Sequence, residues 1–224
     1  MVFDVEEAEE FAGIAGAVTV NIGTLSPPFV AGMHAAIRGA RGAWRPWVLD
    51  PVACQATAYR REVVQALVAE RPTIIRGNAS EILSLAGEAS KGQGVDGRDP
   101  VAAAEEGARR LARSSGAVVA VTGEVDYVTD GTRAVRVEGG SPFMPMNTAL
   151  GCSLTCLCGA YAAVAEDAFD AAVAALAHFA VAGAKADEGA SGPGSFAPRF
   201  LDALAAVTPA DLSRAAIYDA AVPA

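Results

Sequence analysis

The chain has 224 residues, of which 52% are hydrophobic and 19% are charged, and its formal net charge is −9. This length can bury one large core, so we expect a single domain over residues 1–224. Binding to nucleic acid or to an anionic membrane needs clustered Lys and Arg, which an acidic chain does not favour. The composition therefore favours a small-molecule partner.

Short apolar runs that stop at a polar residue or at glycine are typical of buried parallel strands. Such runs occupy residues 17–23, 47–50, 73–77 and 117–123. Segments with helical spacing and end signals lie between them, at residues 27–39, 60–70, 78–86 and 100–113. This alternation predicts an α/β fold with crossover helices. The Gly-rich polar segment 87–99 is interpreted as a flexible surface connection rather than a phosphate-binding loop.

The pattern changes after Gly123, where two alternating segments flank Asp130-Gly131 and predict an antiparallel hairpin at the edge of the sheet. From Gly151 onward the sequence predicts three packed helices, a fourth helix beginning at Thr208-Pro209, and no strand. The apolar run 169–184 is short for a bilayer span and rich in alanine, so we interpret it as a buried helix.

The four cysteines form no paired framework of the kind that small secreted domains use, and we recognise no signal peptide. We therefore expect reduced thiols and a cytoplasmic protein. Cys156 and Cys158 are interpreted as small buried residues. Trp44 and Trp47 are interpreted as core or interface anchors, and both histidines as structural residues.

In a parallel sheet, ligands bind beyond the carboxyl ends of the strands, and three of these ends carry reactive groups. Asp50, held before Pro51, could bind a water or a metal ion, although an ordinary turn is the better explanation of this dipeptide considered by itself. Asn78 and Glu81 have the spacing of a capping box, and beside Arg76 the same pair could bind Mg²⁺ and a phosphate. Thr122 offers a hydroxyl to a phosphate.

A fourth element, residues 148–152, has the composition of a helix start that binds an anion. Successive backbone N–H groups up to Gly151 and Cys152 would face the strand ends. The positive end of the helix dipole is expected to lower the pKa of Cys152 and to let it act as a base.

Seven short motifs occur in a specific order along almost the whole chain: NIGTL (21–25), LDPV (49–52), ATAYR (56–60), IRGNASEI (75–82), VTGEVDYVTDG (121–131), GC (151–152) and GPGSF (192–196). In this order and spacing the chain resembles the hydroxyethylthiazole kinases. The resemblance implies a ribokinase-like three-layer α/β/α fold with a mostly parallel central sheet and an antiparallel edge hairpin. It also implies a homotrimer that uses ATP and Mg²⁺ to phosphorylate the hydroxyl of 4-methyl-5-(2-hydroxyethyl)thiazole.

The resemblance assigns roles to individual residues. It implies ATP contacts from Arg76, Thr122, Asn78 and Gly151, metal contacts from Glu81 and Asp50, substrate contacts from Met1 and Ala149, and a catalytic base at Cys152.

The chain departs from the family pattern in three places. It has Ala149-Leu150 where the family has Gly followed by Thr or Ala, it has Ala53 within the family's DPVGxG motif, and it begins near the substrate-contacting Met. Two alternatives to the thiazole kinase therefore stay open: a catalytically impaired pseudo-kinase that serves as a nucleotide-binding or interaction module, and a related hydroxymethylpyrimidine-type kinase.

Overall fold

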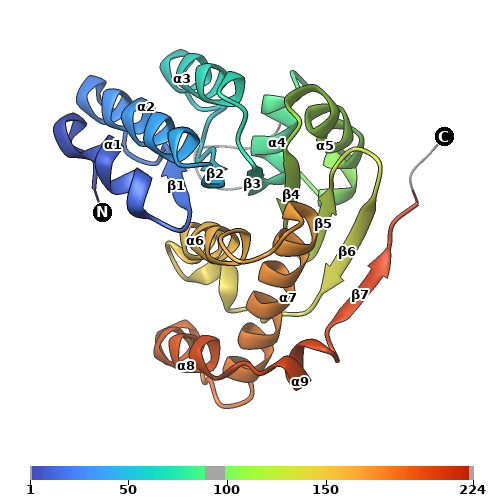
Figure 1. The fold of residues 1–224 in the computed structure, drawn as a ribbon. Helices are drawn as coiled ribbons and strands as arrows, with labels where there is room; N and C mark the ends of the chain where they lie inside the picture. Colours follow the sequence, from blue (N-terminus) through green and yellow to red (C-terminus); the bar gives the residue numbers. More distant parts are fainter. Residues whose placement is uncertain (1, 89–98, 222–224) are drawn as a thin grey trace.

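The structure is a computed structural model that describes residues 2–88 and 99–221 of the chain (Figure 1). In this part, a sheet of seven strands runs in sequence order from one edge to the other. The strands are β1 (Val18–Asn21), β2 (Trp47–Asp50), β3 (Ile74–Asn78), β4 (Val118–Thr122), β5 (Val125–Thr129), β6 (Ala134–Glu138) and β7 (Ala216–Asp219). Strands β1 to β4 pair in parallel, and the three pairings from β4 to β7 are antiparallel.

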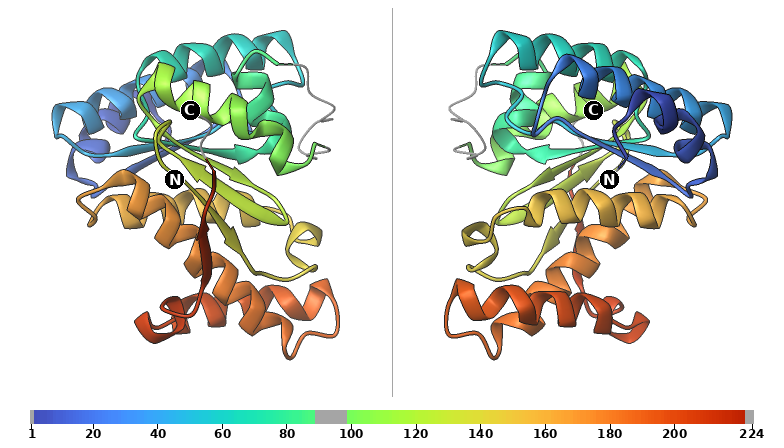
Figure 2. Two further views of the ribbon diagram at one scale, coloured as in Figure 1. Left: turned by 90° about the vertical axis from the view of Figure 1, so that its right-hand side faces the viewer. Right: turned by 90° about the vertical axis from the view of Figure 1, so that its left-hand side faces the viewer.

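Helices cover both faces of the sheet, which gives three layers (Figure 2). One layer holds α2 (Pro27–Gly42), α3 (Ala58–Ala69), α4 (Ala79–Leu85) and α5 (Val101–Ser115), with α1 (Val5–Ile14) packed on α2. The other face carries α6 (Leu150–Ala162) and α7 (Ala168–Asp187), with α8 (Pro193–Ala206) and the short α9 (Pro209–Leu212) packed on α7. A 3₁₀ turn, η1 (Met144–Met146), precedes α6.

Two hydrophobic clusters, one on each face, hold the layers together. Successive strand residues point to opposite faces, so that Leu49 and Ile75 join the cluster under α2 to α5. Val48 and Ile74 join the cluster under α6 and α7. This two-sided burial explains why the parallel strands read as continuous apolar runs.

The strand and helix predictions before Gly151 are confirmed, including the hairpin, whose Gly131 has a φ of 94°. The prediction that no strand follows Gly151 is wrong, because β7 pairs with β6 and extends the antiparallel part of the sheet. Helix α1 was not predicted either. The loop prediction for residues 87–99 falls mostly outside the described residues.

Helix α7 is the one described helix that is long and apolar enough to cross a membrane by those two criteria. It packs against β4, β5, β6, α6 and α8, and 11 of its residues are buried. The prediction that this segment is a buried helix is confirmed.

Helix α1 packs closely on α2 at two glycines. A Cβ added to Gly32 would overlap the carbonyl oxygen of Phe3, and one added to Gly39 would overlap that of Glu9. The Phe3 ring also stacks on Phe29, with the ring centroids 4.5 Å apart. Close backbone contact therefore fixes α1 on α2.

We expect Gly39→Ala to lower the free energy of unfolding by about 1–3 kcal/mol, because the methyl group must displace α1. Hydrogen exchange in residues 5–14 should become faster. The control is Gly42→Ala in the same helix, where an added Cβ meets nothing within 4 Å. Equal exchange rates in the two variants would show that α1 tolerates the methyl group.

Candidate active site

A cleft of about 880 Å³ lies at the carboxyl ends of the parallel strands, between the strand ends and the start of α6. The described residues that the sequence predicted for the site all line it: Asp50, Arg76, Asn78, Glu81, Thr122, Ala149, Gly151 and Cys152. Met1, the other predicted substrate contact, lies outside the described residues. These residues come from the ends of three strands, β2, β3 and β4, and from the starts of two helices, α4 and α6.

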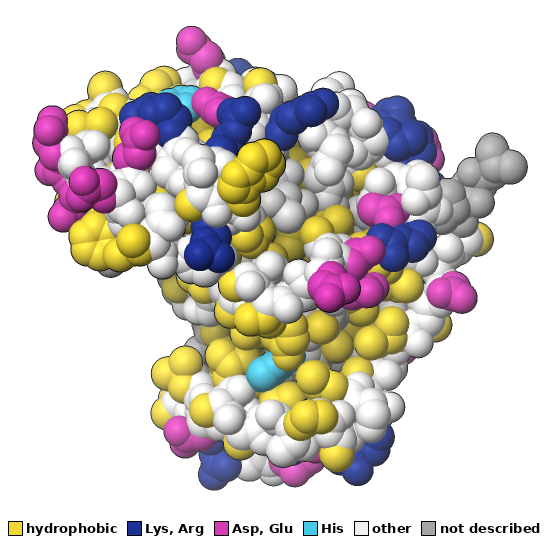
Figure 3. Space-filling model, in the orientation of Figure 1, with side chains coloured by type: hydrophobic (Ala, Val, Ile, Leu, Met, Phe, Trp, Pro, Cys, Tyr) yellow, Lys and Arg dark blue, Asp and Glu magenta, His cyan; other side chains and the backbone are white. Residues whose placement is uncertain are grey.

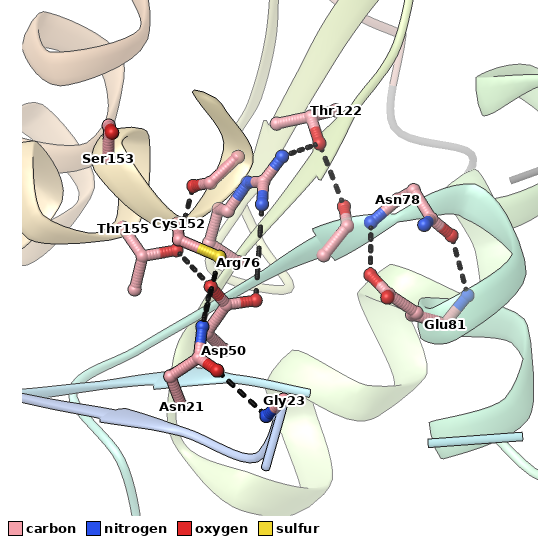
Figure 4. A network of polar contacts seen from close by, with 12 residues as sticks. Asn21, Gly23, Asp50, Arg76, Asn78, Glu81, Thr122, Cys152, Ser153 and Thr155 are labelled. Carbon is pink, nitrogen blue, oxygen red and sulfur yellow. Dashed lines mark hydrogen bonds and ion pairs between the residues drawn. The ribbon is translucent and has the colours of Figure 1, made fainter. Parts of the chain in front are cut away.

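Asp50, the last residue of β2, lies at the centre of a polar network (Figure 4). It is only 1% exposed, and its Oδ2 accepts hydrogen bonds from Asn21 Nδ2 at 2.8 Å and from Thr155 Oγ1 at 3.0 Å. Its Oδ1 lies 3.9 Å from Arg76 Nη1 and has no hydrogen-bond partner. Burial raises the pKa of Asp50, although the Arg76 charge and these hydrogen bonds oppose the shift.

Arg76 connects this carboxylate to the neighbouring strand and to α6. Its Nη2 donates to Thr122 Oγ1 at 2.6 Å, at the end of β4. A Cβ on Gly151 would lie 2.6 Å from Arg76 Nη1, so a larger residue at this position would displace the guanidinium. Arg76 is therefore held between Asp50, Thr122 and Gly151, with its charge beside the anion-binding turn.

Asn78 and Glu81 form the predicted capping box at the start of α4. Asn78 Oδ1 accepts from the Glu81 N–H, and Glu81 Oε2 accepts from the Asn78 N–H at 2.9 Å. Glu81 Oε1 also accepts from the Ala53 N–H at 2.8 Å. Burial raises the pKa of Glu81 to about 7. The capping function is confirmed, and it places the carboxylate in the wall of the cleft.

The start of α6 has the geometry of an anion site. Ala149 is its N-cap, with φ 69° and no side-chain cap, so the first N–H groups of the helix have no capping partner. These N–H groups and the helix dipole favour negative charge. Ala149 is in the left-handed region, where a side chain raises the backbone energy. The resemblance puts glycine at this position.

Cys152 lies in the first turn of α6, and Asn21 Nδ2 donates to its Sγ at 3.2 Å. The predicted lowering of its pKa is wrong. Burial and then the negative charge of Asp50 raise the pKa of Cys152. These effects outweigh the hydrogen bond from Asn21 and the positive charge of Arg76, so the thiol keeps its proton in the free protein.

The Mg²⁺ that the resemblance implies fits two of these side chains. Among the residues that the structure describes, no group of three or more His, Cys, Asp or Glu is placed to hold a metal. Mg²⁺, however, commonly takes one or two carboxylates and completes its shell with phosphate oxygens and water. Asp50 offers a buried oxygen without a hydrogen-bond partner, and the Glu81 carboxylate lines the same cleft.

Two polar residues of this network, Asn21 and Thr155, were not among the predicted site residues. Asn21, at the end of β1, donates to both Asp50 and Cys152, and its Oδ1 accepts from the Gly23 N–H at 2.7 Å. Thr155 lies three residues after Cys152, on the same face of α6. The motif NIGTL and this helical spacing were the signals that could have identified them.

Two predictions elsewhere in the chain, each for a pair of residues, have mixed outcomes. Cys158 and Trp47 are buried as predicted. Cys156 is exposed, which corrects its interpretation as a buried residue. Trp44 is 94% exposed and therefore is not a core residue.

We expect Ala149→Gly to raise the free energy of unfolding by about 0.5–1 kcal/mol, because glycine adopts a positive φ without a steric penalty. Ala160→Gly, at an exposed position inside the same helix, should lower it by about 1 kcal/mol. Urea denaturation measures both values. Destabilisation by both substitutions would contradict a left-handed Ala149.

The pKa of Glu81 predicts how stability depends on pH. Because its pKa of about 7 in the folded protein exceeds the ordinary pKa of 4.5 for glutamate, the folded protein holds an extra proton between these pH values. Stability is therefore lost as the pH rises through this window. Without nucleotide or metal, Glu81 should contribute a loss of roughly 2 kcal/mol between about pH 5.5 and pH 8.

Glu81→Gln removes this pH-dependent contribution. It also lowers stability at every pH by about 1–3 kcal/mol, because an amide cannot accept from both the Ala53 and Asn78 N–H groups. The control is Thr57→Ala, which removes the α3 cap and leaves Glu81 unchanged. Equal pH slopes in wild type and Glu81→Gln would contradict the raised pKa.

Comparison with known proteins agrees with this geometry. Residues 1–210 match the model of the hydroxyethylthiazole kinase family. A hydroxyethylthiazole kinase from Rhizobium etli is 67% identical to this chain, and the match covers 92% of this chain and 81% of that protein. One from Cereibacter sphaeroides is 60% identical, and the match covers 99% of this chain and 84% of that protein.

Solved structures give the same assignment. The hydroxyethylthiazole kinase protein from Pyrococcus horikoshii OT3 has a TM-score of 0.89 and 33% identity, and the match covers 99% of this chain and 84% of that one. Pyridoxal kinase from Staphylococcus aureus shares the fold, with a TM-score of 0.58 and 16% identity. The match covers 82% of this chain and 66% of that one. The ribokinase-like fold is thus confirmed, and the chain belongs to the hydroxyethylthiazole kinase family.

Proposed function

We propose that this chain transfers the γ-phosphoryl group of ATP to the hydroxyl of 4-methyl-5-(2-hydroxyethyl)thiazole, as a Mg²⁺-dependent kinase domain over residues 1–224. The observation that carries the proposal is the convergence of Asp50, Arg76, Glu81, Thr122 and Cys152 on one cleft in a member of this family. We further propose a cytoplasmic homotrimer, on the resemblance alone. Sedimentation equilibrium tests the trimer through a mass three times that of one chain.

Each residue of the cleft has a separate role in the proposed phosphoryl transfer. The N–H groups at the start of α6 bind phosphate oxygens, and Arg76 and Thr122 add a charge and a hydroxyl beside them. A Mg²⁺ ion held by Asp50 and Glu81 would neutralise phosphate charge when bound. Donors that are already in position need no reorganisation during the reaction.

Cys152 Sγ is the proposed proton acceptor for the substrate hydroxyl. The thiol holds its proton in the free protein, because burial and Asp50 raise its pKa. Asn21 fixes the sulfur relative to Asp50 by donating to both. A cation bound to Asp50 would neutralise the charge of this carboxylate. It would thereby favour the Cys152 thiolate, because the Asp50 charge is one of the two main causes of the raised pKa of Cys152.

We expect Cys152→Ala to lower kcat roughly a hundredfold or more and to change KM little, because a base acts in the transition state. The measurement is steady-state kinetics at saturating ATP and thiazole alcohol. Cys156→Ala is the matched control, since this thiol is exposed on the same helix, and it should keep the wild-type kcat. A wild-type kcat in Cys152→Ala would show that the thiol only fills space.

A further inference from the structure

A second pocket, of about 460 Å³, lies at the opposite ends of the strands from the kinase cleft. Trp47, the first residue of β2, lines this pocket, whereas Asp50, the last residue of the same strand, lines the cleft. The loop from α6 to α7 forms its other wall. The pocket is therefore separate from the proposed active site.

Positive charge gathers in this pocket although the chain as a whole is acidic. Arg41, Arg45 and Arg71 line it, against one carboxylate, Glu166. Arg41 pairs with Glu70 at 2.9 Å. Neither Arg45 nor Arg71 forms an ion pair in residues 2–88 or 99–221. On the face shown in Figure 3, Lys and Arg side chains gather over α2 and α3, which end near the pocket.

The ends of α2 and α3 do not explain these arginines. Backbone N–H groups already satisfy the final carbonyls: Arg45 N–H donates to Ala40 at 2.8 Å, Glu70 N–H to Leu67 at 3.0 Å and Arg71 N–H to Val68 at 3.0 Å. The Arg45 and Arg71 guanidinium groups make no hydrogen bond to these carbonyls in the described chain. They remain available to a ligand.

The two tryptophans of the pocket differ in exposure. Trp44 is 94% exposed, so its indole is open to stacking. Trp47 is 2% exposed and belongs to the hydrophobic cluster under α2 to α5, and its buried Nε1 has no surface that a ligand could reach. Trp44 is therefore the ring surface that the pocket offers.

The backbone of two pocket residues follows from the helix ends. Trp44 (φ 56°) and Arg71 (φ 60°) each come directly after a helix C-cap, of α2 and of α3. A left-handed residue at this position commonly ends a helix. Their conformation therefore has a local structural cause.

We propose that this pocket binds a small phosphate ester that carries an aromatic ring, of the nucleoside monophosphate class. Arg45 and Arg71 hold the phosphate through charge-assisted hydrogen bonds. The ring stacks on Trp44, and Glu166 accepts from a ligand hydroxyl or amino group.

Tryptophan fluorescence gives a direct test, because Trp44 and Trp47 are the only two tryptophans in the sequence and both line this pocket. Titration of the full chain with AMP should give a saturable change. The double variant Arg45→Gln/Arg71→Gln should bind AMP at least about tenfold more weakly. The control Arg110→Gln/Arg214→Gln removes the same charge at exposed positions elsewhere and should keep the wild-type Kd.

Two further titrations separate the ring from the phosphate, with adenosine and inorganic phosphate as probes. Both should bind more weakly than AMP, and Trp44→Ala should weaken AMP while leaving inorganic phosphate unchanged, as measured by calorimetry. Inorganic phosphate that binds as tightly as AMP would overturn ring recognition. If AMP binds wild type and Arg45→Gln/Arg71→Gln equally, the proposal is overturned and the nucleotide binds in the kinase cleft. A fluorescence signal that AMP leaves unchanged would also overturn the proposal.

Discussion

The buried carboxylate of Asp50 is the constraint on which the site depends. A carboxylate that is 1% exposed needs compensation, and Arg76, Asn21 and Thr155 supply it from three different elements. These contacts fix the ends of β1, β2 and β3 relative to α6. The interaction leaves Asp50 Oδ1 without a hydrogen bond, so the same charge that ties the elements together still has an oxygen for a ligand.

The sequence predicts the fold well where local pattern and tertiary environment agree. Buried parallel strands appear as apolar runs, and the Asp130-Gly131 turn fixes the hairpin. Strand β7 was missed because all four of its residues are exposed and its structure depends on pairing with β6. Helix α1 was missed because its position depends on backbone contacts at Gly32 and Gly39, which no periodicity of α1 itself reveals.

In the candidate site, too, the sequence predicts some features and misses others that depend on the tertiary structure. Strand ends located Asp50, Arg76 and Thr122, since the topology alone brings these ends to one edge. The direction of the Cys152 pKa shift could not be read from sequence, because it depends on burial and on a charge 102 positions away in the chain. Trp44 and Trp47 lie three positions apart yet have opposite exposures, because Trp44 follows the end of α2 whereas Trp47 begins the buried strand β2.

The sequential strand order bears on how the chain folds. Each strand from β2 to β6 pairs with the strand that precedes it in the sequence, so the sheet can grow in the order of synthesis. The pairing of β6 with β7 differs, because the helical segment between Glu138 and Ala216 must close a long loop first. Until β7 is made, β6 is an unpaired edge in the nascent chain. Early folding intermediates are therefore expected to be open to intermolecular pairing at β6, which the last strand removes.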